Sequence, residues 1–314
     1  MGSKCIGIDI GGTSVKLGIF TVEGKLLEKW EVPTRKENNG SQILPDVAVS
    51  IKKKLKEMGI EKDDVIGAGV GVPGPILPDG SVEVCVNLGW KNANPQEELS
   101  GLLDGMLVRS GNDANVAALG EMWQGGGMGC RDMVMVTLGT GVGGGVIIDE
   151  KIIAGRHGLA GEIGHIHVRD EETEYCNCGG RGCLEQVASA TGIAREARRA
   201  MAASQEPSSM RRFGDHISAK NVLDCAKSGD ALALEVTETV SRYLGLACAQ
   251  IALTVDPEAF VIGGGVSRAG QFLIDRIQKY YDSYVAISAN KGVLKLAKLG
   301  NDAGIFGAAR LVLD

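Results

Sequence analysis

The sequence predicts an α/β protein made of two related halves. Apolar runs of strand length alternate with segments whose apolar residues recur at helical spacing, along most of the 314 residues. A strand, a glycine turn and a second strand occur at residues 4–20 and again at 133–148, about 130 residues later. Glycine clusters where strands end, and such turns expose backbone N–H groups to a ligand. We therefore expect two halves that each offer a glycine loop to one shared cleft.

The first half should open with an antiparallel meander, because its first three strand-like runs follow one another with short turns between them. Asn112 and Asp113 are good N-cap types and predict the start of a helix. The expected elements are strands at residues 4–10, 15–20, 26–32, 65–72 and 106–109, and helices at 41–58, 95–103 and 114–123.

The second half repeats the opening scheme and then becomes mainly helical. Residues 155–186 are irregular and hold most of the unusual chemistry, and residues 204–211 read as a surface loop. The expected elements are strands at residues 133–138, 145–148, 259–262 and 293–297, helices between 187 and about 254, and helices at 269–281 and 303–312.

Charge and composition exclude several function classes. The formal net charge is −6, so the chain has no general electrostatic attraction to nucleic acid or to anionic membranes. It contains no apolar stretch of the length of a membrane span and no signal-peptide pattern. We expect a cytoplasmic protein without nucleic-acid or membrane partners. Its eight cysteines should be reduced there, which favours metal binding over disulfides for a tight cluster.

Three glycine loops follow strands and fit a nucleotide phosphate chain: DIGGTSVK from Asp9, LGTGVGGG from Leu138, and GGGVS from Gly263. Asp9 can hold Mg²⁺ through water, because Mg²⁺ keeps much of its hydration shell. Each loop alone also fits a plain turn, but three at strand ends favour ATP. The predicted nucleotide-binding residues are Asp9, Gly11, Gly12, Thr13, Lys16, Gly139, Thr140, Gly141, Gly264 and Gly265.

A cysteine cluster predicts a structural zinc site. Cys176, Cys178 and Cys183 lie within eight residues of one another, and His165 precedes them by eleven. Three thiolates and one imidazole make a closed tetrahedral set, with no position left to activate water. A disulfide is the weaker alternative, because pairing within C-x-C is strained. The other five cysteines are scattered in apolar patterns and read as core residues.

These motifs together resemble the ROK family of repressors and sugar kinases, within the actin-like ATPase superfamily. The resemblance rests on DIGGT, GNDANVAA, LGTGVGGG, GEIGH, CNCGGRGCLE and IGGGVS, in that order along almost the whole chain. It implies a two-domain α/β actin-like ATPase (ribonuclease H-like) fold, with ATP and sugar in the interdomain cleft. The implied small domain is residues 1–114 plus 301–314. Residues 115–300 would form the large domain with the zinc-binding loop.

The resemblance also implies the roles of the polar residues. Asp113 would be the catalytic base, although by itself it could be an ordinary helix cap. Isolated glutamates could equally be surface charges. His165 would serve both zinc and sugar, since zinc on one ring nitrogen orients the other. The implied sugar-binding residues are Asn112, Asp113, Glu162, His165 and Glu185.

The expected activity is ATP-dependent phosphorylation of a hexose. Glucose is favoured, because VNLGW and CNCGGRGCLEQ are similar to glucokinases of the family. Fructose, mannose, allose, N-acetylglucosamine and N-acetylmannosamine stay open, since one hydroxyl contact can switch preference. A sugar-sensing repressor is disfavoured, because the first strand begins near Lys4 and leaves no room for a DNA-binding domain. An actin-like structural ATPase would not need the zinc cluster or the sugar-pocket residues. We also expect a homo-oligomer, either a dimer or a tetramer.

Overall fold

The computed structural model describes residues 2–77 and 79–313, and contacts divide the chain into two compact units. The first unit comprises Met1–Gly129, Gly145–Ala160 and Leu299–Asp314, and the second comprises Cys130–Gly144 and Gly161–Lys298. These units keep the helix that begins at Asp113 with the first sheet, whereas the family-based division placed its boundary at residue 114. That division into two functional domains stays a prediction.

The first sheet has the strand order β3-β2-β1-β4-β7. Strands β1, β2 and β3 pair antiparallel, which confirms the predicted meander, and β4 and β7 extend the sheet in parallel with β1. The bounds are β1 (Lys4–Ile10), β2 (Ser14–Thr21), β3 (Leu26–Pro33), β4 (Val65–Val72) and β7 (Val108–Asn112).

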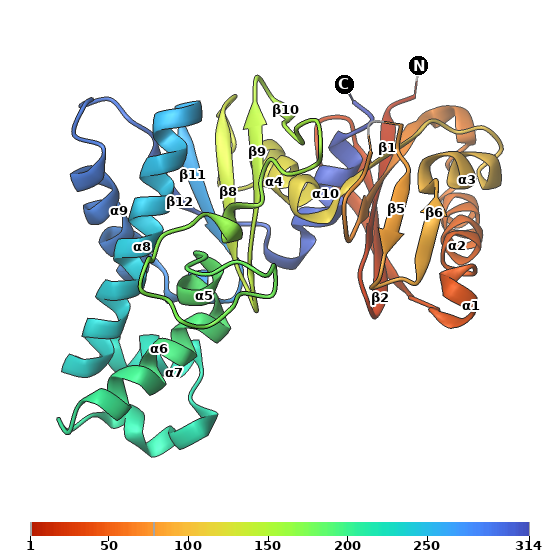
Figure 1. The fold of residues 1–314 in the computed structure, drawn as a ribbon. Helices are drawn as coiled ribbons and strands as arrows, with labels where there is room; N and C mark the ends of the chain where they lie inside the picture. The colour runs from red at the N-terminus through yellow and green to blue at the C-terminus, as the bar shows by residue number, and fades with distance from the viewer. Residues whose placement is uncertain (1, 78, 314) are drawn as a thin grey trace. The chain divides into compact units, whose positions relative to one another are not determined.

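The second sheet repeats this plan, in the order β10-β9-β8-β11-β12 (Figure 1). Three sequential strands are again followed by two parallel strands, which agrees with the predicted relation between the halves. Strand β9 begins three residues before the predicted Gly145, so the second glycine loop is shorter than expected. The bounds are β8 (Met133–Leu138), β9 (Val142–Ile148), β10 (Lys151–Ile152), β11 (Ala259–Gly263) and β12 (Val293–Leu296).

Alternating side chains of β1 serve two different helix layers. Ile6 and Ile8 are buried in the cluster that contains the apolar face of α2 (Ile43–Met58). Cys5, on the other face, is buried with residues of α10 (Ala303–Arg310). This alternation follows from the period of two along a strand. The first sheet is therefore covered on both faces, and Asp9 belongs to the face that meets α10.

Glycine lets α10 approach the first sheet very closely. A Cβ atom on Gly7 of β1 would overlap the carbonyl oxygen of Ile305, and one on Gly69 of β4 would overlap that of Ala308. Only the absence of a side chain at these two positions permits such contact. The last helix of the chain is thus seated on the backbone of the first two parallel strands.

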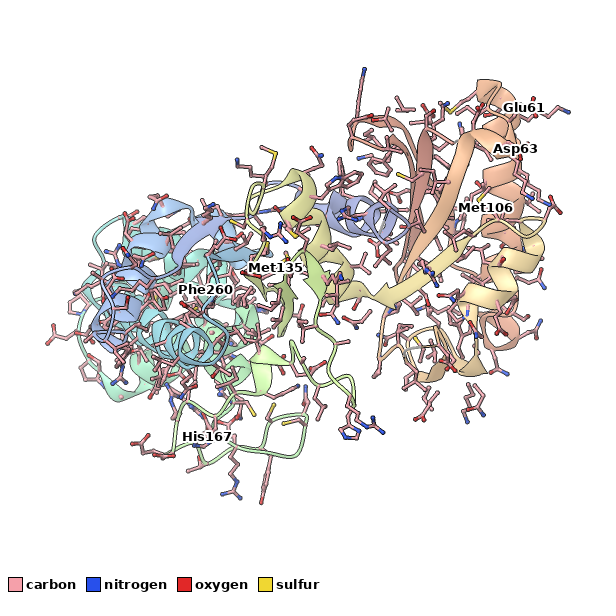
Figure 2. The ribbon with its side chains drawn as sticks, turned by 90° about the horizontal axis from the view of Figure 1, so that it is seen from above. Glu61, Asp63, Met106, Met135, His167 and Phe260 are labelled. Carbon is pink, nitrogen blue, oxygen red and sulfur yellow. The ribbon has the colours of Figure 1, made fainter. Side chains whose placement is uncertain are left out.

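Most of the remaining helices belong to the second unit. There α9 packs against α8 and β12, and Figure 2 marks Met135 of β8 and Phe260 of β11 in the same unit. No helix within residues 2–77 and 79–313 has both the length and the apolar character needed to cross a bilayer. The remaining elements are α1 (Glu37–Gly40), α3 (Pro95–Leu102), α4 (Asp113–Gln124), α5 (Glu185–Ala188), α6 (Ala190–Ala203), α7 (Ala219–Lys227), α8 (Ala231–Val255), α9 (Gln271–Tyr284) and a hairpin of β5 (Val82–Cys85) with β6 (Trp90–Ala93).

A fully buried carboxylate lies beside the first exit of the chain from the first unit and its last return to it. Glu121, in α4, accepts a hydrogen bond from the backbone N–H of Gly126 at 2.7 Å. Its other oxygen accepts from the N–H of Leu299 at 2.8 Å. Gly126 shortly precedes the passage into the second unit at residue 130, and Leu299 is the first residue after the return. One side chain therefore binds the backbone beside the first and the last of the four passages between the units.

Candidate active site

The carboxyl ends of three parallel strands bring the acidic residues of the first unit to one edge. Asp9 of β1 pairs with Gly71 of β4, and Gly71 pairs with Gly111 of β7, just before Asn112. Because neighbouring strands lie about 4.8 Å apart, backbones separated by one strand are about 10 Å apart. Asp9 and Asp113 thus flank the same sheet edge, where open α/β sheets commonly bind ligands.

The first glycine loop, residues 11–13, is a tight turn with exposed backbone. Gly11 donates its N–H to the carbonyl of Ser14 at 3.0 Å, and the hydroxyl of Thr34 donates to the carbonyl of Gly11 at 2.7 Å. Gly12 and Thr13 are exposed. A Cβ on Gly12 would lie 3.4 Å from the ammonium of Lys36, which the sequence analysis did not select. A cation beside bare amides is well suited to a phosphate group.

Asp9 carries the features of a cation ligand. Burial raises the pKa of its carboxyl group to about 6, while the charge of Lys16 lowers it and that of Asp113 raises it. A Cβ on Gly304 of α10 would lie only 2.6 Å from the carboxylate carbon, so this glycine leaves the space that Asp9 occupies. A half-buried carboxylate near a second acid is stabilised by a bound cation. The residues at this edge therefore fit Mg²⁺.

Asn112 and Asp113 form the predicted start of α4. The side-chain oxygen of Asn112 accepts from the backbone N–H groups of Ala114 and Asn115, at 3.0 and 3.1 Å. Its amide nitrogen donates to Asp113 at 3.1 Å and to the carbonyl of Gly74 at 3.1 Å. Asn112 is thus the N-cap, and it orients the carboxylate of Asp113. The positive end of the helix favours the ionised form of an acid at this position.

The two glycine loops of the second unit also share one sheet edge. The second loop, residues 139–141, follows β8, and Gly264 follows the neighbouring strand β11. Gly264 has φ 84°, and a Cβ there would overlap the carbonyl oxygen of Leu138. Glycine is required here both for the backbone conformation and for the close approach. A short 3₁₀ helix, Val266–Ala269, follows Gly265 before α9 begins.

The four predicted zinc ligands lie together in the second unit. Their ligand atoms are all within 4.8 Å of one another. The Sγ atoms of Cys178 and Cys183 are 3.6 Å apart, and Sγ of Cys176 is 3.8 Å from Nδ1 of His165. Ligands about 2.3 Å from a tetrahedral zinc would be about 3.8 Å apart. The set therefore fits zinc closely, and Gly179, at φ 86°, provides a turn between the cysteines.

Titration of the thiols depends on their surroundings. Burial, and next hydrogen bonds with the neighbouring thiols, raise the pKa of Cys183 to about 12. The backbone N–H of Gly180, and next the neighbouring thiols, lower the pKa of Cys178. Zinc binds thiolates, so it must displace these protons, and the affinity of such a site rises with pH.

His165 has its two ring nitrogens directed to different neighbours. Nδ1 faces Cys176, whereas Nε2 is 3.9 Å from the carboxylate of Glu162, which is more than half exposed. Zinc on Nδ1 would therefore leave Nε2 available beside Glu162. His167, marked in Figure 2, is bound instead to Asp170 and to the carbonyl of Arg181, at 2.7 and 2.9 Å. These bonds, Asp170 first, raise the pKa of His167.

A buried ion cluster holds the metal loop, residues 162–184, to α6. Glu172 is almost fully buried and accepts from Arg199 at 2.9 and 3.0 Å and from Arg195 at 3.1 Å. Arg169 makes two parallel hydrogen bonds to Glu196 at 2.9 and 2.8 Å. Charge-assisted bonds of this kind are strong when several charges share one site. The loop is thus fixed by contacts other than the metal ligands.

Replacing Glu172 by glutamine should remove an acid-sensitive contribution to stability. Hydrogen bonds from Arg199 hold the pKa of Glu172 at about 2, although burial opposes this shift. A lowered pKa stabilises the fold above the ordinary value of about 4.5, and the stabilisation is lost as pH falls through about 2. We expect Glu172→Gln to be about 3 kcal/mol less stable at pH 7 in urea unfolding, with a difference that shrinks on acidification.

Glu174→Gln is the matched control for that experiment. Glu174 binds Arg195 and Arg199 as well, but its side chain is 56% exposed. Exposed ion pairs contribute about 1 kcal/mol or less. A Glu172→Gln difference that stayed constant from neutral pH to strong acid would show that the titration of this carboxylate does not contribute.

Glu185 lies between the metal loop and the second glycine loop. Its Oε2 accepts from the N–H of Val142 at 2.9 Å, and its Oε1 is 3.9 Å from Sγ of Cys176. A cavity of about 470 Å³ opens beside it, within the usual range for small-molecule sites. Its walls include the glycine loop at Thr140 and Gly141, and residues of the metal loop and of α6.

The structure thus gathers the predicted residues into one set in each unit. Asp9, Lys16 and the Asn112–Asp113 pair share the edge of the first sheet. In the second unit, the metal ligands form one cluster, with Glu162 and Glu185 beside it. The sequence analysis missed Lys36 and the ion cluster around Glu172, because both depend on contacts between segments distant in sequence.

Two matched sheets, each ending in a glycine loop, define a two-domain α/β protein of the actin-like ATPase fold. The ROK family model matches residues 5–314, and the chain belongs to the ROK family. It is 42% identical to a glucokinase of Halalkalibacterium halodurans over 98% of this chain and 94% of that one. Similar solved structures include a ROK hexokinase from Thermus thermophilus, with 30% identity, a TM-score of 0.81, and coverage of 98% and 96%. Another is a ROK glucokinase from Streptomyces griseus in complex with glucose and AMPPNP, with 33% identity, a TM-score of 0.74, and 98% coverage of each chain.

Proposed function

We propose that this chain is an ATP-dependent hexose kinase that converts glucose to glucose 6-phosphate, with Asp113 as the general base. The observation that carries the proposal is the placement of Asp113 at the same sheet edge as Asp9 and the first glycine loop. A proton acceptor is thereby held close to the residues suited to a triphosphate and its cation. The glucokinase relatives, which match this chain over nearly its full length, support the same activity.

Phosphoryl transfer here requires one proton acceptor and exact positioning of the hydroxyl. The sugar hydroxyl oxygen forms a bond to the γ-phosphorus of ATP, the bond from that phosphorus to the ADP oxygen breaks, and the hydroxyl proton passes to the Asp113 carboxylate. Asn112 holds that carboxylate through its side-chain amide. An ionised carboxylate at a helix N-terminus is ready to accept the proton at neutral pH.

The glycine loops supply backbone donors for the phosphates. In the first unit these are Gly12 and Thr13, because the N–H of Gly11 is donated to Ser14 within the turn, with Lys16 and Lys36 as nearby cations. In the second unit they are Thr140, Gly141 and Gly264–Gly265, because the N–H of Gly139 is donated to the carbonyl of Gly141 within the loop. Asp9 would hold Mg²⁺, which neutralises charge on the phosphates when bound. Oriented donors and cations of this kind stabilise the charge that spreads over the transferred group.

The sugar-binding set in the proposal is Asn112, Asp113, Glu162, His165 and Glu185. Zinc on His165, Cys176, Cys178 and Cys183 would fix the ring of His165 and the loop around it. The ligand distances support this metal, and the donor set suits it. Cytoplasmic location and a homo-oligomeric state, a dimer or a tetramer, are part of the same proposal.

A coupled ADP-release assay across a panel of hexoses tests the activity and its preference together. Purified protein with Mg²⁺ and ATP is offered glucose, fructose, mannose, allose, N-acetylglucosamine and N-acetylmannosamine. We expect the highest kcat/KM with glucose, because buried polar partners reject a sugar that leaves them unpaired. A higher value with another sugar would correct the substrate but keep the reaction class. No ADP release with any of them would refute the kinase.

A further inference from the structure

One short segment that follows the metal loop makes three hydrogen bonds to the second glycine loop and its junction with β9. The carbonyl of Gly139 accepts from the N–H of Ala190 at 2.8 Å. The carbonyl of Thr140 accepts from the hydroxyl of Thr191 at 3.0 Å. The N–H of Val142 donates to the carboxylate of Glu185 at 2.9 Å. Three positions in and next to a loop of bare backbone are thus fixed by residues 185–191.

The absence of a side chain at Gly141 allows the second glycine loop to lie close to the carboxylate of Glu185. A Cβ there would overlap Oε2 of Glu185, so the loop backbone lies directly against the carboxylate. A charge-assisted hydrogen bond from a backbone N–H is stronger than a neutral one. Glu185 therefore fixes the conformation of the loop at its junction with β9.

The same segment is anchored to the metal loop at its other end. Cys183 donates its N–H to Gln186 at 3.2 Å, and Leu184 donates to the carbonyl of Ile166 at 2.9 Å. Gln186 in turn donates to the carbonyl of Glu174 at 3.0 Å and accepts at its own carbonyl from Arg195. Glu185 lies two residues after a metal ligand and 3.9 Å from the sulfur of Cys176.

We infer that Glu185 is a positioning residue for the nucleotide, besides its expected contact with the sugar. Residues 185–191 act as a strut: the metal loop fixes the start of the segment, and Glu185, Ala190 and Thr191 hold the second glycine loop in the shape that receives phosphate. This inference rests on the proposed function, because the loop is taken to bind ATP. It predicts that a change at Glu185 weakens nucleotide binding even when no sugar is present.

The test is the affinity for Mg²⁺·AMPPNP, measured by calorimetry without sugar, in wild type and two variants of Glu185. Alanine removes the acceptor for the N–H of Val142, and we expect about a tenfold weaker Kd. Glutamine keeps an acceptor oxygen, and we expect a Kd within about twofold of wild type. Rescue by glutamine distinguishes positioning of the loop from a general loss of charge.

Glu162→Ala is the matched control, because it removes another predicted sugar-binding carboxylate of the same unit. Its carboxylate faces His165 rather than the glycine loop. We expect this variant to raise the KM for glucose and to leave the Kd for AMPPNP unchanged. Equal loss of nucleotide affinity in Glu162→Ala and Glu185→Ala would overturn the strut.

A second variant decides the matter if Glu185→Ala loses zinc or unfolds. Thr191→Val removes the bond to Thr140 at the end of the strut away from the metal, whereas Thr191→Ser keeps the hydroxyl. We expect the valine variant to bind AMPPNP about threefold more weakly, with zinc retained, and the serine variant to match wild type. If Thr191→Val and a folded Glu185→Ala variant both bind AMPPNP as tightly as wild type, the strut is refuted but the proposed ATP site is not. Wild-type protein that binds no AMPPNP refutes the proposed ATP site and the strut with it.

Discussion

Replacing Asp113 by asparagine is expected to lower kcat about a thousand-fold, while glucose and ATP still bind. Asparagine has nearly the same shape and keeps an oxygen that can accept from Asn112 and from the N–H of Ala114. The start of α4 should therefore remain intact. What asparagine cannot do is take up the proton of the sugar hydroxyl. The measurement is kcat by coupled ADP release, with glucose affinity by calorimetry.

Asp63→Asn provides the control for this change. Asp63 is an exposed acid of the same unit, marked in Figure 2, and its loss alters the net charge equally. We expect its turnover to match wild type. If Asp113→Asn kept turnover within about tenfold of wild type, general-base catalysis by this residue would be excluded, since that effect is typically about a hundredfold or more.

Replacing Cys176 by serine is expected to abolish stoichiometric zinc binding. Serine is a poor zinc ligand, and the loss of one thiolate opens a site that otherwise has four ligands. We expect at least about a hundredfold weaker zinc affinity and a lower thermal midpoint. The ion cluster around Glu172 should keep the loop attached to α6, so the loss should be local. Metal analysis by mass spectrometry and thermal unfolding with and without chelator measure both effects.

Cys130→Ser is the matched cysteine change outside the cluster. Cys130 is half-buried, its sulfur lies 3.6 Å from the ammonium of Lys295, and it should be replaceable without loss of metal. One full equivalent of zinc in purified Cys176→Ser would remove Cys176 from the ligand set. If the strut of residues 185–191 is correct, Cys176→Ser should also weaken AMPPNP binding, because the metal loop anchors it.

The sequence predicted most elements of the two sheets because their strands are apolar and bounded by turns. The antiparallel start of the chain, the buried strand at 65–72 and the strand at 133–138 were all located from pattern alone. Short strands such as β5 and β6 were missed, since four residues whose buried and exposed side chains do not alternate carry no clear period.

The extent of the second glycine loop was misjudged for a physical reason. Residues 143–145 are all glycine, and residues 142–144 were interpreted as part of the loop, yet they belong to β9. A Cβ on Gly144 would overlap Ile163, and one on Gly145 would lie 2.6 Å from the side chain of Ala118. Glycine here serves close packing rather than a turn, and a single sequence does not distinguish the two uses.

In the candidate site too, the features that depend on residues close in sequence could be predicted, and the contacts between distant segments could not. Asn112 as helix cap and the clustering of the four predicted metal ligands depend on neighbours in sequence, and both were predictable. The pairing of Glu172 with Arg199, and the contact of Glu185 with Val142, join segments 27 and 43 residues apart. Such contacts follow from tertiary packing, which propensity and spacing do not encode.

Glu121 links two backbone segments that lie far apart in the sequence. The carboxylate of Glu121 accepts hydrogen bonds from the backbone N–H groups of both Gly126 and Leu299. A displacement of the backbone at Gly126 would therefore also disturb the hydrogen bond that holds Leu299. A shift of this carboxylate would lengthen or break both hydrogen bonds. The two segments therefore share one hydrogen-bonding partner, and a substitution at Glu121 would alter the anchoring of both at once.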